Sequence, residues 1–337
     1  MLDLSNGYEG RRDEAARVHH AAWRRCDGVA ARGESLAGDG VFLQMRTRMR
    51  AVFVFVITWT ILLPEVVTTA QTVPTRASWV SVRYVPPKNA AHQPISEELQ
   101  ELRFLEKLQE LLSPFRLPGT LLIQLEGCDG DANASYENSV ISVCYEYVDQ
   151  LWKSMPSETT MDGVAPVDAL VGPLLDTCLH EFAHAIFEML RVPVLGREED
   201  AADQVSAYLI LNLGKAEARR LIGGVSYAHK TEADAATAPL AMTQFADAHG
   251  TPAQRFYNVL CIAFGADAQL FGDFVDKGHL PKERAEDCKE EYQQVANAYE
   301  TLIGPHVDYR RAKEVFDKTW LPDPTIRVRR TPGSPPK

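Results

Sequence analysis

The chain has 337 residues, of which 45% are hydrophobic and 24% are charged. This balance is typical of a globular protein and excludes a collagen-like or wholly disordered chain, while the length allows one large domain or two closely packed lobes. The formal net charge of −11 disfavours binding to nucleic acid or to an anionic membrane, so we expect no nucleic-acid partner.

The N-terminal part has the features of a targeting segment rather than of a fold. Residues 1–44 are polar and lack sustained periodicity, which predicts a disordered extension or a mis-assigned start upstream of Met45. Residues 45–70 combine a basic start, an apolar stretch over 51–63 and a small, polar end, which predicts a secretory signal peptide cleaved before Gln71. We therefore expect an exported protein, periplasmic or extracellular. The alternative is an uncleaved N-terminal anchor formed by residues 51–63, which would be its only contact with the membrane.

The remaining chain predicts an α+β domain over residues 71–321, followed by a disordered Pro-rich tail over 322–337. Alternating apolar residues predict a small N-terminal sheet, mixed or antiparallel, and helical periodicity predicts a mainly helical body after it. The expected strands are 79–85, 120–125 and 140–144. The expected helices are 96–112, capped by Ser96, then 145–155, about 166–191, about 197–213, 252–265, 269–277, 281–302 and 311–319.

The motif with the clearest chemistry is His180-Glu181-Phe-Ala-His184 within the expected helix 166–191. Two histidines four residues apart project from one face of a helix, where one Zn²⁺ can bind both imidazoles. Glu181 lies beside the first histidine, where a general base is needed. The alternative is a purely structural core helix whose histidines form hydrogen bonds with the backbone or with carboxylates.

An acidic cluster downstream offers the third metal ligand. Pro193 and Gly196 end the first helix, and a second helix from about residue 197 returns antiparallel toward the histidines. Glu199 and Asp203 share a face of that helix. We therefore expect Glu199 to bind the metal and Asp203 to accept the other ring N–H of a ligand histidine. The neighbouring acids, Glu198 and Asp200, are interpreted as ordinary residues that complement the helix dipole.

These residues resemble the zincin superfamily on its glutamate-ligand (gluzincin) side. More closely, the chain over about residues 78–305 resembles a bacterial family of unknown function, described as putative metallopeptidases. The segments Phe245–His249 and Gln254–Asn258 and Cys261 share in this likeness. The resemblance implies a zincin-like fold with an HExxH helix and a zinc site, but no substrate. In zincins a strand at the edge of the cleft binds the substrate backbone, and Val140–Cys144 is our candidate by analogy.

The residues together predict a zinc metallopeptidase with one Zn²⁺ per chain and a peptide or protein as substrate. Glu181 would act as general base, and His249 is the preferred group to stabilise the oxyanion, oriented by Asp247. Tyr227, His229 and Tyr257 are the other candidates for that second role. The alternative functions are a zinc-binding but catalytically inert exported protein, or a helical binding module with a chance motif.

Cysteine spacing supports export. In an oxidising compartment the economical disulfides are the two local pairs, Cys128–Cys144 and Cys261–Cys288. Cys178 remains unpaired. Because it lies two residues before His180, it points away from the metal-binding face of the helix, and we expect a buried free thiol.

Overall fold

The computed structural model describes residues 79–235 and 242–325, which all belong to the compact unit Thr72–Lys337. The segments 1–44 and 45–70, and with them the expected leader, lie outside the described residues. So does most of the expected tail, of which only residues 322–325 are described. The domain boundaries, the signal peptide and the anchor therefore stay predictions.

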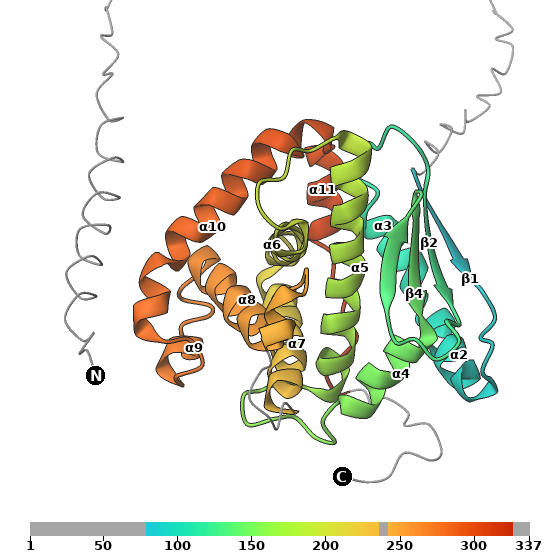
Figure 1. The fold of residues 1–337 in the computed structure, drawn as a ribbon, viewed down its shortest axis with the longest axis horizontal. Coiled ribbons are helices and arrows are strands. Elements are labelled where there is room, and N and C mark those ends of the chain that lie inside the picture. Colours follow the sequence, from blue (N-terminus) through green and yellow to red (C-terminus); the bar gives the residue numbers. More distant parts are fainter. Residues whose placement is uncertain (1–78, 236–241, 326–337) are drawn as a thin grey trace, which may run out of the picture. The chain divides into compact units, whose positions relative to one another are not determined.

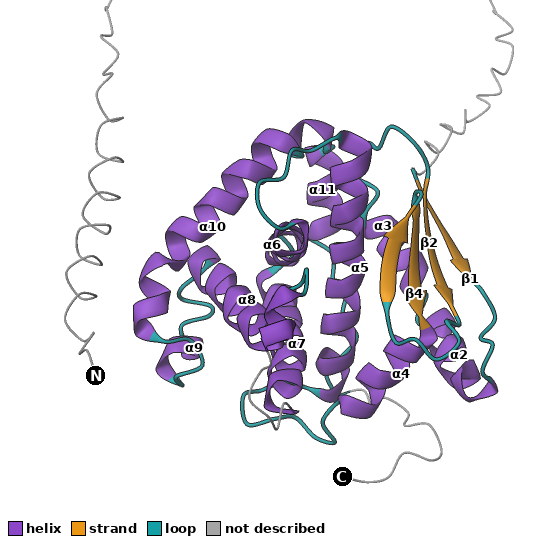
Figure 2. Ribbon diagram, in the orientation of Figure 1, coloured by secondary structure: helices purple, strands orange, loops and turns teal. Residues whose placement is uncertain are grey.

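One four-stranded mixed sheet is formed by β1 (Val80–Tyr84), β2 (Leu121–Glu126), β3 (Ala134–Glu137) and β4 (Val140–Cys144). The strand order is β1-β2-β4-β3, with β1, β2 and β4 parallel and β3 antiparallel to β4. Figure 2 shows this sheet beside a larger helical body, so the predicted α+β class with a small sheet is confirmed. The choice of Val140–Cys144 as the edge strand is wrong, because β4 is paired on both sides and the unpredicted β3 forms the edge.

The expected helix 96–112 is in fact two helices, α2 (Gln93–Glu101) and α3 (Phe104–Leu111). Arg103 interrupts the run with a left-handed backbone (φ 52°). Ser96 does not cap a helix but lies buried inside α2, with its hydroxyl 3.0 Å from that of Tyr145. The leucine stripe that predicted one helix is therefore divided by a turn at residues 102–103.

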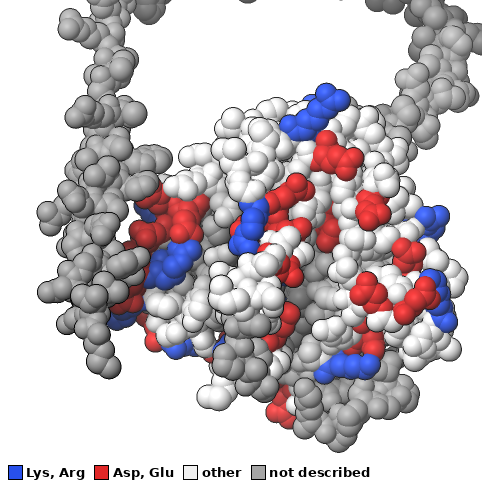
Figure 3. Space-filling model, in the orientation of Figure 1, with Lys and Arg blue, Asp and Glu red and all other residues white. Residues whose placement is uncertain are grey.

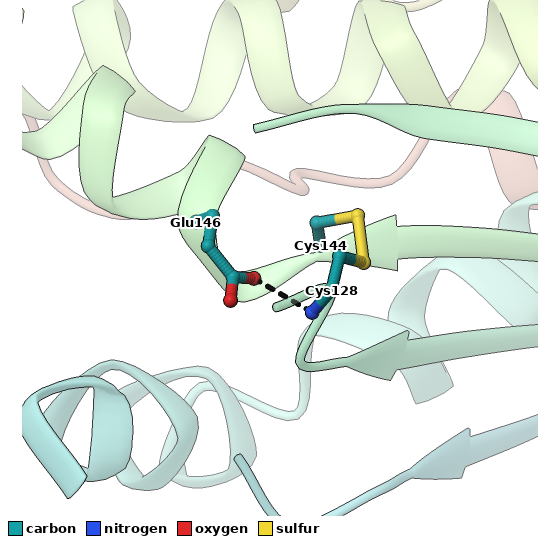
Figure 4. A group of neighbouring side chains, drawn as sticks. All are labelled: Cys128, Cys144 and Glu146. Atoms are coloured by element: carbon teal, nitrogen blue, oxygen red, sulfur yellow. Dashed lines mark hydrogen bonds between the residues drawn. A yellow bond between two sulfur atoms is a disulfide. The ribbon is translucent and has the colours of Figure 1, made fainter. Parts of the chain in front are cut away.

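A disulfide, Cys128–Cys144, closes the loop that leads into β3 (Figure 4). Glu146, in the first turn of α4 (Tyr145–Ser154), accepts the backbone N–H groups of Cys128 at 3.0 Å and Gly130 at 3.3 Å. Cys128, Cys144 and Glu146 lie close enough together to suggest a metal site. The two cysteine sulfurs are bonded to each other, however, so these residues do not form one. Their role is to fix the loop beside the edge strand.

The helical body is built around α5 (Pro166–Leu190), which Figure 1 shows between the sheet and the other long helices. Leucines, isoleucines and phenylalanines of α5 face both layers, and most of the helix is buried. The other elements are η1 (Ala90–His92), α6 (Glu198–Leu211), α7 (Lys215–Ala235), η2 (Met242–Ala246), α8 (Pro252–Ala266), α9 (Asp273–Asp276), α10 (Lys282–Leu302), η3 (Gly304–His306) and α11 (Tyr309–Phe316).

Two glycines let α7 pack against the backbone of α5. A Cβ on Gly224 would overlap the carbonyl oxygen of Asp168, and one on Gly172 would lie 2.8 Å from the carbonyl oxygen of Leu221. Arg220 reinforces the crossing by donating to both carboxylate oxygens of Asp168, at 2.6 and 3.1 Å. The position of α7 relative to the HExxH segment is therefore set by backbone contact.

The second expected disulfide, Cys261–Cys288, joins α8 to α10. The structure thus contains both pairings that the spacing predicts, and Cys178 is buried with a free thiol. Two disulfides are compatible with an exported protein. Over the described ranges 79–235 and 242–325, no helix is both long enough and apolar enough to cross a bilayer.

Candidate metal centre

Local structure places the two histidines of the motif on one side of α5. Pro166 at the first helical turn starts the helix, and Arg191 with a left-handed backbone (φ 54°) ends it one residue after Leu190. His180 and His184 are then one turn apart, with ring centroids separated by 4.9 Å. Gly196 (φ +100°) lies in the connection that turns the chain into α6, which packs against α5.

Three donor atoms converge between α5 and α6. Nε2 of His180 lies 3.0 Å from Oε2 of Glu199 and 3.2 Å from Nε2 of His184, and the remaining edge, from His184 Nε2 to Glu199 Oε2, measures 3.3 Å. Ligands about 2.1 Å from a tetrahedral zinc ion lie about 3.4 Å from one another, close to these three distances. The triangle therefore matches three ligands of such an ion.

The outer hydrogen bonds of the two rings fix which nitrogen faces the centre. Nδ1 of His180 is 2.8 Å from Asp203 Oδ1, and Nδ1 of His184 is 2.8 Å from Glu198 Oε1. An ionised carboxylate only accepts, so each ring carries its proton on Nδ1 and directs the Nε2 lone pair inward. Two imidazole nitrogens and a carboxylate oxygen that face one another at this distance can share a cation, so the donor set fits a metal ion.

The electrostatics of the cluster favour positive charge. Burial opposes protonation of His180, but hydrogen bonds to Asp203 and Glu199 outweigh it and raise the pKa of this imidazole to about 9. The hydrogen bond from His180 and the nearby rings of His249 and His184 lower the pKa of Glu199 to about 2. The field that favours a proton at this point also favours a metal cation.

Asp203 is held from two sides. It accepts from His180 and also from Arg255 of α8, whose Nε and a terminal nitrogen lie 2.8 and 2.7 Å from its two oxygens. Burial opposes ionisation of Asp203, yet these partners lower the pKa of its carboxyl well below the usual range. Deeper in the structure, burial raises the pKa of Asp176 to about 6, although Ser206 donates to its carboxylate at 2.6 Å.

Glu181 lies beside the cluster in a cavity of about 880 Å³ that we call the cleft. β3, α4, α5 and α7 contribute most of its lining, and His249 and Arg255 close the remaining side. Glu181 is 8% exposed, and burial raises the pKa of its carboxyl. A carboxylate with a raised pKa is a stronger base than an exposed one, as a general base requires.

His249 reaches the same cluster from the segment before α8. Its Nε2 is 2.9 Å from Glu199 Oε2, and its ring stacks on that of His180 with centroids 5.8 Å apart. Asp247 accepts the backbone N–H of His249 at 2.9 Å and has an oxygen 3.5 Å from its Nδ1. The side chain is 47% exposed and lines the cleft.

The competing candidates for the second catalytic role are placed differently. His229 lines the cleft, where burial lowers the pKa of its imidazole to about 3. Tyr227 and Tyr257 are not among the described residues that line the cleft. Tyr227 donates to the carbonyl oxygen of Ser154, and Tyr257 is exposed on α8.

Sequence reasoning missed two contacts of this site, that of Arg255 with Asp203 and that of Glu198 with His184. Glu198 was interpreted as an ordinary N-terminal helix acid, yet it bonds to His184. Asp200 does have the expected surface role, since it pairs with Arg197 at 2.8 Å. The helical face shared with Asp203 singled out Glu199, but the ring that Glu198 reaches depends on the angle between α5 and α6.

The fold and this cluster define an α+β protein with a His-His-Glu set of candidate metal ligands and a neighbouring buried carboxylate. Residues 84–303 match the model of a family described as "Putative metallopeptidase", and the chain belongs to that family. The predicted family relationship is thereby confirmed, and membership implies a metal ion. No curated protein and no solved structure matches the chain.

Proposed function

We propose that this protein is an exported, zinc-dependent peptidase that hydrolyses peptide bonds in the cleft. The observation that carries the proposal is the convergence of His180 Nε2, His184 Nε2 and Glu199 Oε2 within 3.0–3.3 Å of one another, beside the buried Glu181. Two imidazoles and one carboxylate are a ligand set of catalytic zinc, which keeps one coordination position for water or substrate.

In this reaction the metal and the side chains of the protein have different roles. A bound zinc ion supplies Lewis-acid activation of water and of the scissile carbonyl. Glu181 accepts a proton from the attacking water on its carboxylate and then delivers that proton to the nitrogen of the leaving amine. Asp203 and Glu198 keep the two histidine rings in the tautomer and orientation that present Nε2 inward.

His249 is the residue placed to stabilise the developing oxyanion. Its Nε2 faces the cluster and lies 2.9 Å from Glu199, so a carbonyl oxygen close to the metal position lies within reach of a donated hydrogen bond. Arg255 does not compete for this role, because Asp203 occupies its guanidinium.

The edge strand β3 supplies a binding surface for an extended peptide. Residues 133–136 line the cleft, and β3 pairs with β4 on one side only. Among the described residues no strand pairs with its other side, which can add a substrate segment as a further strand. Such binding would carry a peptide past the cluster and beside Glu181.

The test is zinc content combined with peptide cleavage by the full chain. We expect about one zinc per chain in the wild type and in Glu181→Gln, and none in His184→Ala. A peptide mixture should be cleaved by the wild type, with activity at least about 100-fold lower in Glu181→Gln. Absence of zinc from all three proteins after zinc is supplied, or equal cleavage by Glu181→Gln, would refute the proposal.

A further inference from the structure

We infer that the cleft selects basic peptides, in which Lys or Arg lies within a few residues of the scissile bond. This inference rests on the proposed peptidase function and specifies its substrate class. Its support is the charge of the cleft lining, the charge that remains after a metal ion has bound, and the position of Glu188 and Glu232.

The lining of the cleft is strongly acidic. Its carboxylates come from α5, α6 and α7, near the three candidate metal ligands. They are those of Asp176, Glu181, Glu188, Glu198, Glu199 and Glu232. Among the described residues of this lining, the one Lys or Arg is Arg255, and its charge is matched by Asp203. A cationic peptide is therefore the complementary ligand.

A bound divalent metal does not remove this imbalance. Its two positive charges offset Glu199 and Glu181, which lie in or beside the cluster, and Asp176 is buried and bonded to Ser206. Glu198 bonds to a histidine that a metal keeps neutral. Three carboxylates, those of Glu188, Glu198 and Glu232, then remain without a compensating full charge.

Glu188 is placed to contact a substrate side chain. It lies one turn after His184 on α5, exposed and in the lining of the cleft. Its neighbour across the cleft edge is Tyr136 of β3, where burial raises the pKa of the phenol and the charge of Glu188 adds to that effect. The aliphatic part of a Lys or Arg can pack on this ring while its charged end reaches Glu188.

Glu232 contributes from the opposite side, on α7. It is exposed within the lining, and the nearby Lys230 is paired with Asp234 at 2.5 Å rather than with Glu232. In the part of the chain that the structure describes, no Lys, Arg or His forms an ion pair with Glu188 or Glu232. Neither carboxylate is thus neutralised by a cation of the described residues, and the partner of Glu188 is the uncharged phenol of Tyr136.

The surface around the cleft extends the same field. Figure 3 shows acidic side chains over the middle of the face on which α5 runs, with basic ones mostly nearer its margin. A cavity lined by one sign of charge concentrates the opposite charge and speeds its association. The formal net charge of −11 adds to this attraction.

The test uses blocked decapeptides in matched pairs, identical except that Lys replaces Gln on either side of a cleaved bond. For the zinc-loaded full chain we expect kcat/KM to be about tenfold higher for the Lys peptide, since each carboxylate contributes about two- to fivefold. Glu188→Gln or Glu232→Gln should lower this Lys/Gln ratio about two- to fivefold. Raising the salt from about 0.05 to about 0.5 M should lower it in the wild type.

Glu137→Gln is the matched control, because Glu137 lies next to Tyr136 on β3 but outside the lining of the cleft. This variant removes the same charge and should leave the Lys/Gln ratio within about 1.5-fold of the wild type, as expected for a screened surface charge. Equal cleavage of Lys and Gln peptides, or an equal effect of Glu137→Gln and Glu188→Gln, would overturn this inference alone. Failure of the zinc-loaded protein to cleave any peptide would overturn the proposed function and this inference with it.

Discussion

Replacing Asp203 by asparagine tests whether its contacts with His180 and Arg255 support the candidate metal site. The substitution Asp203→Asn keeps the size of the side chain but removes the charge that accepts from His180 at 2.8 Å and from Arg255 at 2.7 and 2.8 Å. Loss of such an outer partner of a ligand histidine typically costs about 10- to 100-fold in metal affinity. We expect the dissociation constant for zinc to rise by that factor.

The same substitution should also destabilise the metal-free fold. Removing one partner of a buried ion pair costs about 3–5 kcal/mol, because the other charge is left unpaired. The side chains of Arg255 and Asp203 are 23% and 21% exposed, so water screens part of this cost. We expect a loss of about 2–3 kcal/mol in the free energy of unfolding.

The assay is zinc competition against a chromophoric chelator, combined with urea unfolding of the metal-free protein. Asp200→Asn is the control on the same helix, since Asp200 pairs at the surface with Arg197. It should change stability by less than about 1 kcal/mol and leave zinc affinity unaltered. Zinc affinity of Asp203→Asn within about twofold of the wild type, or an equal loss in Asp200→Asn, would show that the contact of Asp203 with His180 does not support the site.

Two further predictions address His249 and the helix crossing. His249→Gln should lower kcat about 100- to 1,000-fold while zinc content stays at one per chain, and loss of zinc would instead identify this histidine as a ligand. Gly224→Ala should destabilise the protein by about 3 kcal/mol or more, since the new Cβ would overlap the backbone of α5. Gly223→Ala is its control, because a Cβ there would lie 3.6 Å from Val164. This variant should be neutral or stabilising by up to about 1 kcal/mol. Equal urea midpoints for the two variants would contradict the close backbone contact between α5 and α7 at Gly224.

Local patterns in the sequence predicted the parts of the structure that depend on local geometry. The spacing of His180 and His184 follows from the helical repeat alone, and helix breakers placed the ends of α5 within a residue. The two disulfides were predictable because each joins cysteines close in sequence, across one loop or between neighbouring helices. Glu199 and Asp203 were chosen because residues four apart share one helical face.

Other features depended on where separate elements meet, and the sequence carried no local signal for them. The break at Arg103 and the edge strand β3 are two examples. A short strand with polar residues, such as β3, is stabilised by its pairing with β4 rather than by its own composition. The contact of Arg255 with Asp203 joins residues 52 positions apart.

The sequence by itself thus determined the helix that carries His180 and His184, the family and the two disulfides. Tertiary structure alone decided that Glu198 reaches His184, that Arg255 supports Asp203, and that Glu188 and Glu232 line one cleft. The physical reason is that helix periodicity acts within a few residues, whereas the partners of a side chain depend on the angles at which distant helices and strands pack.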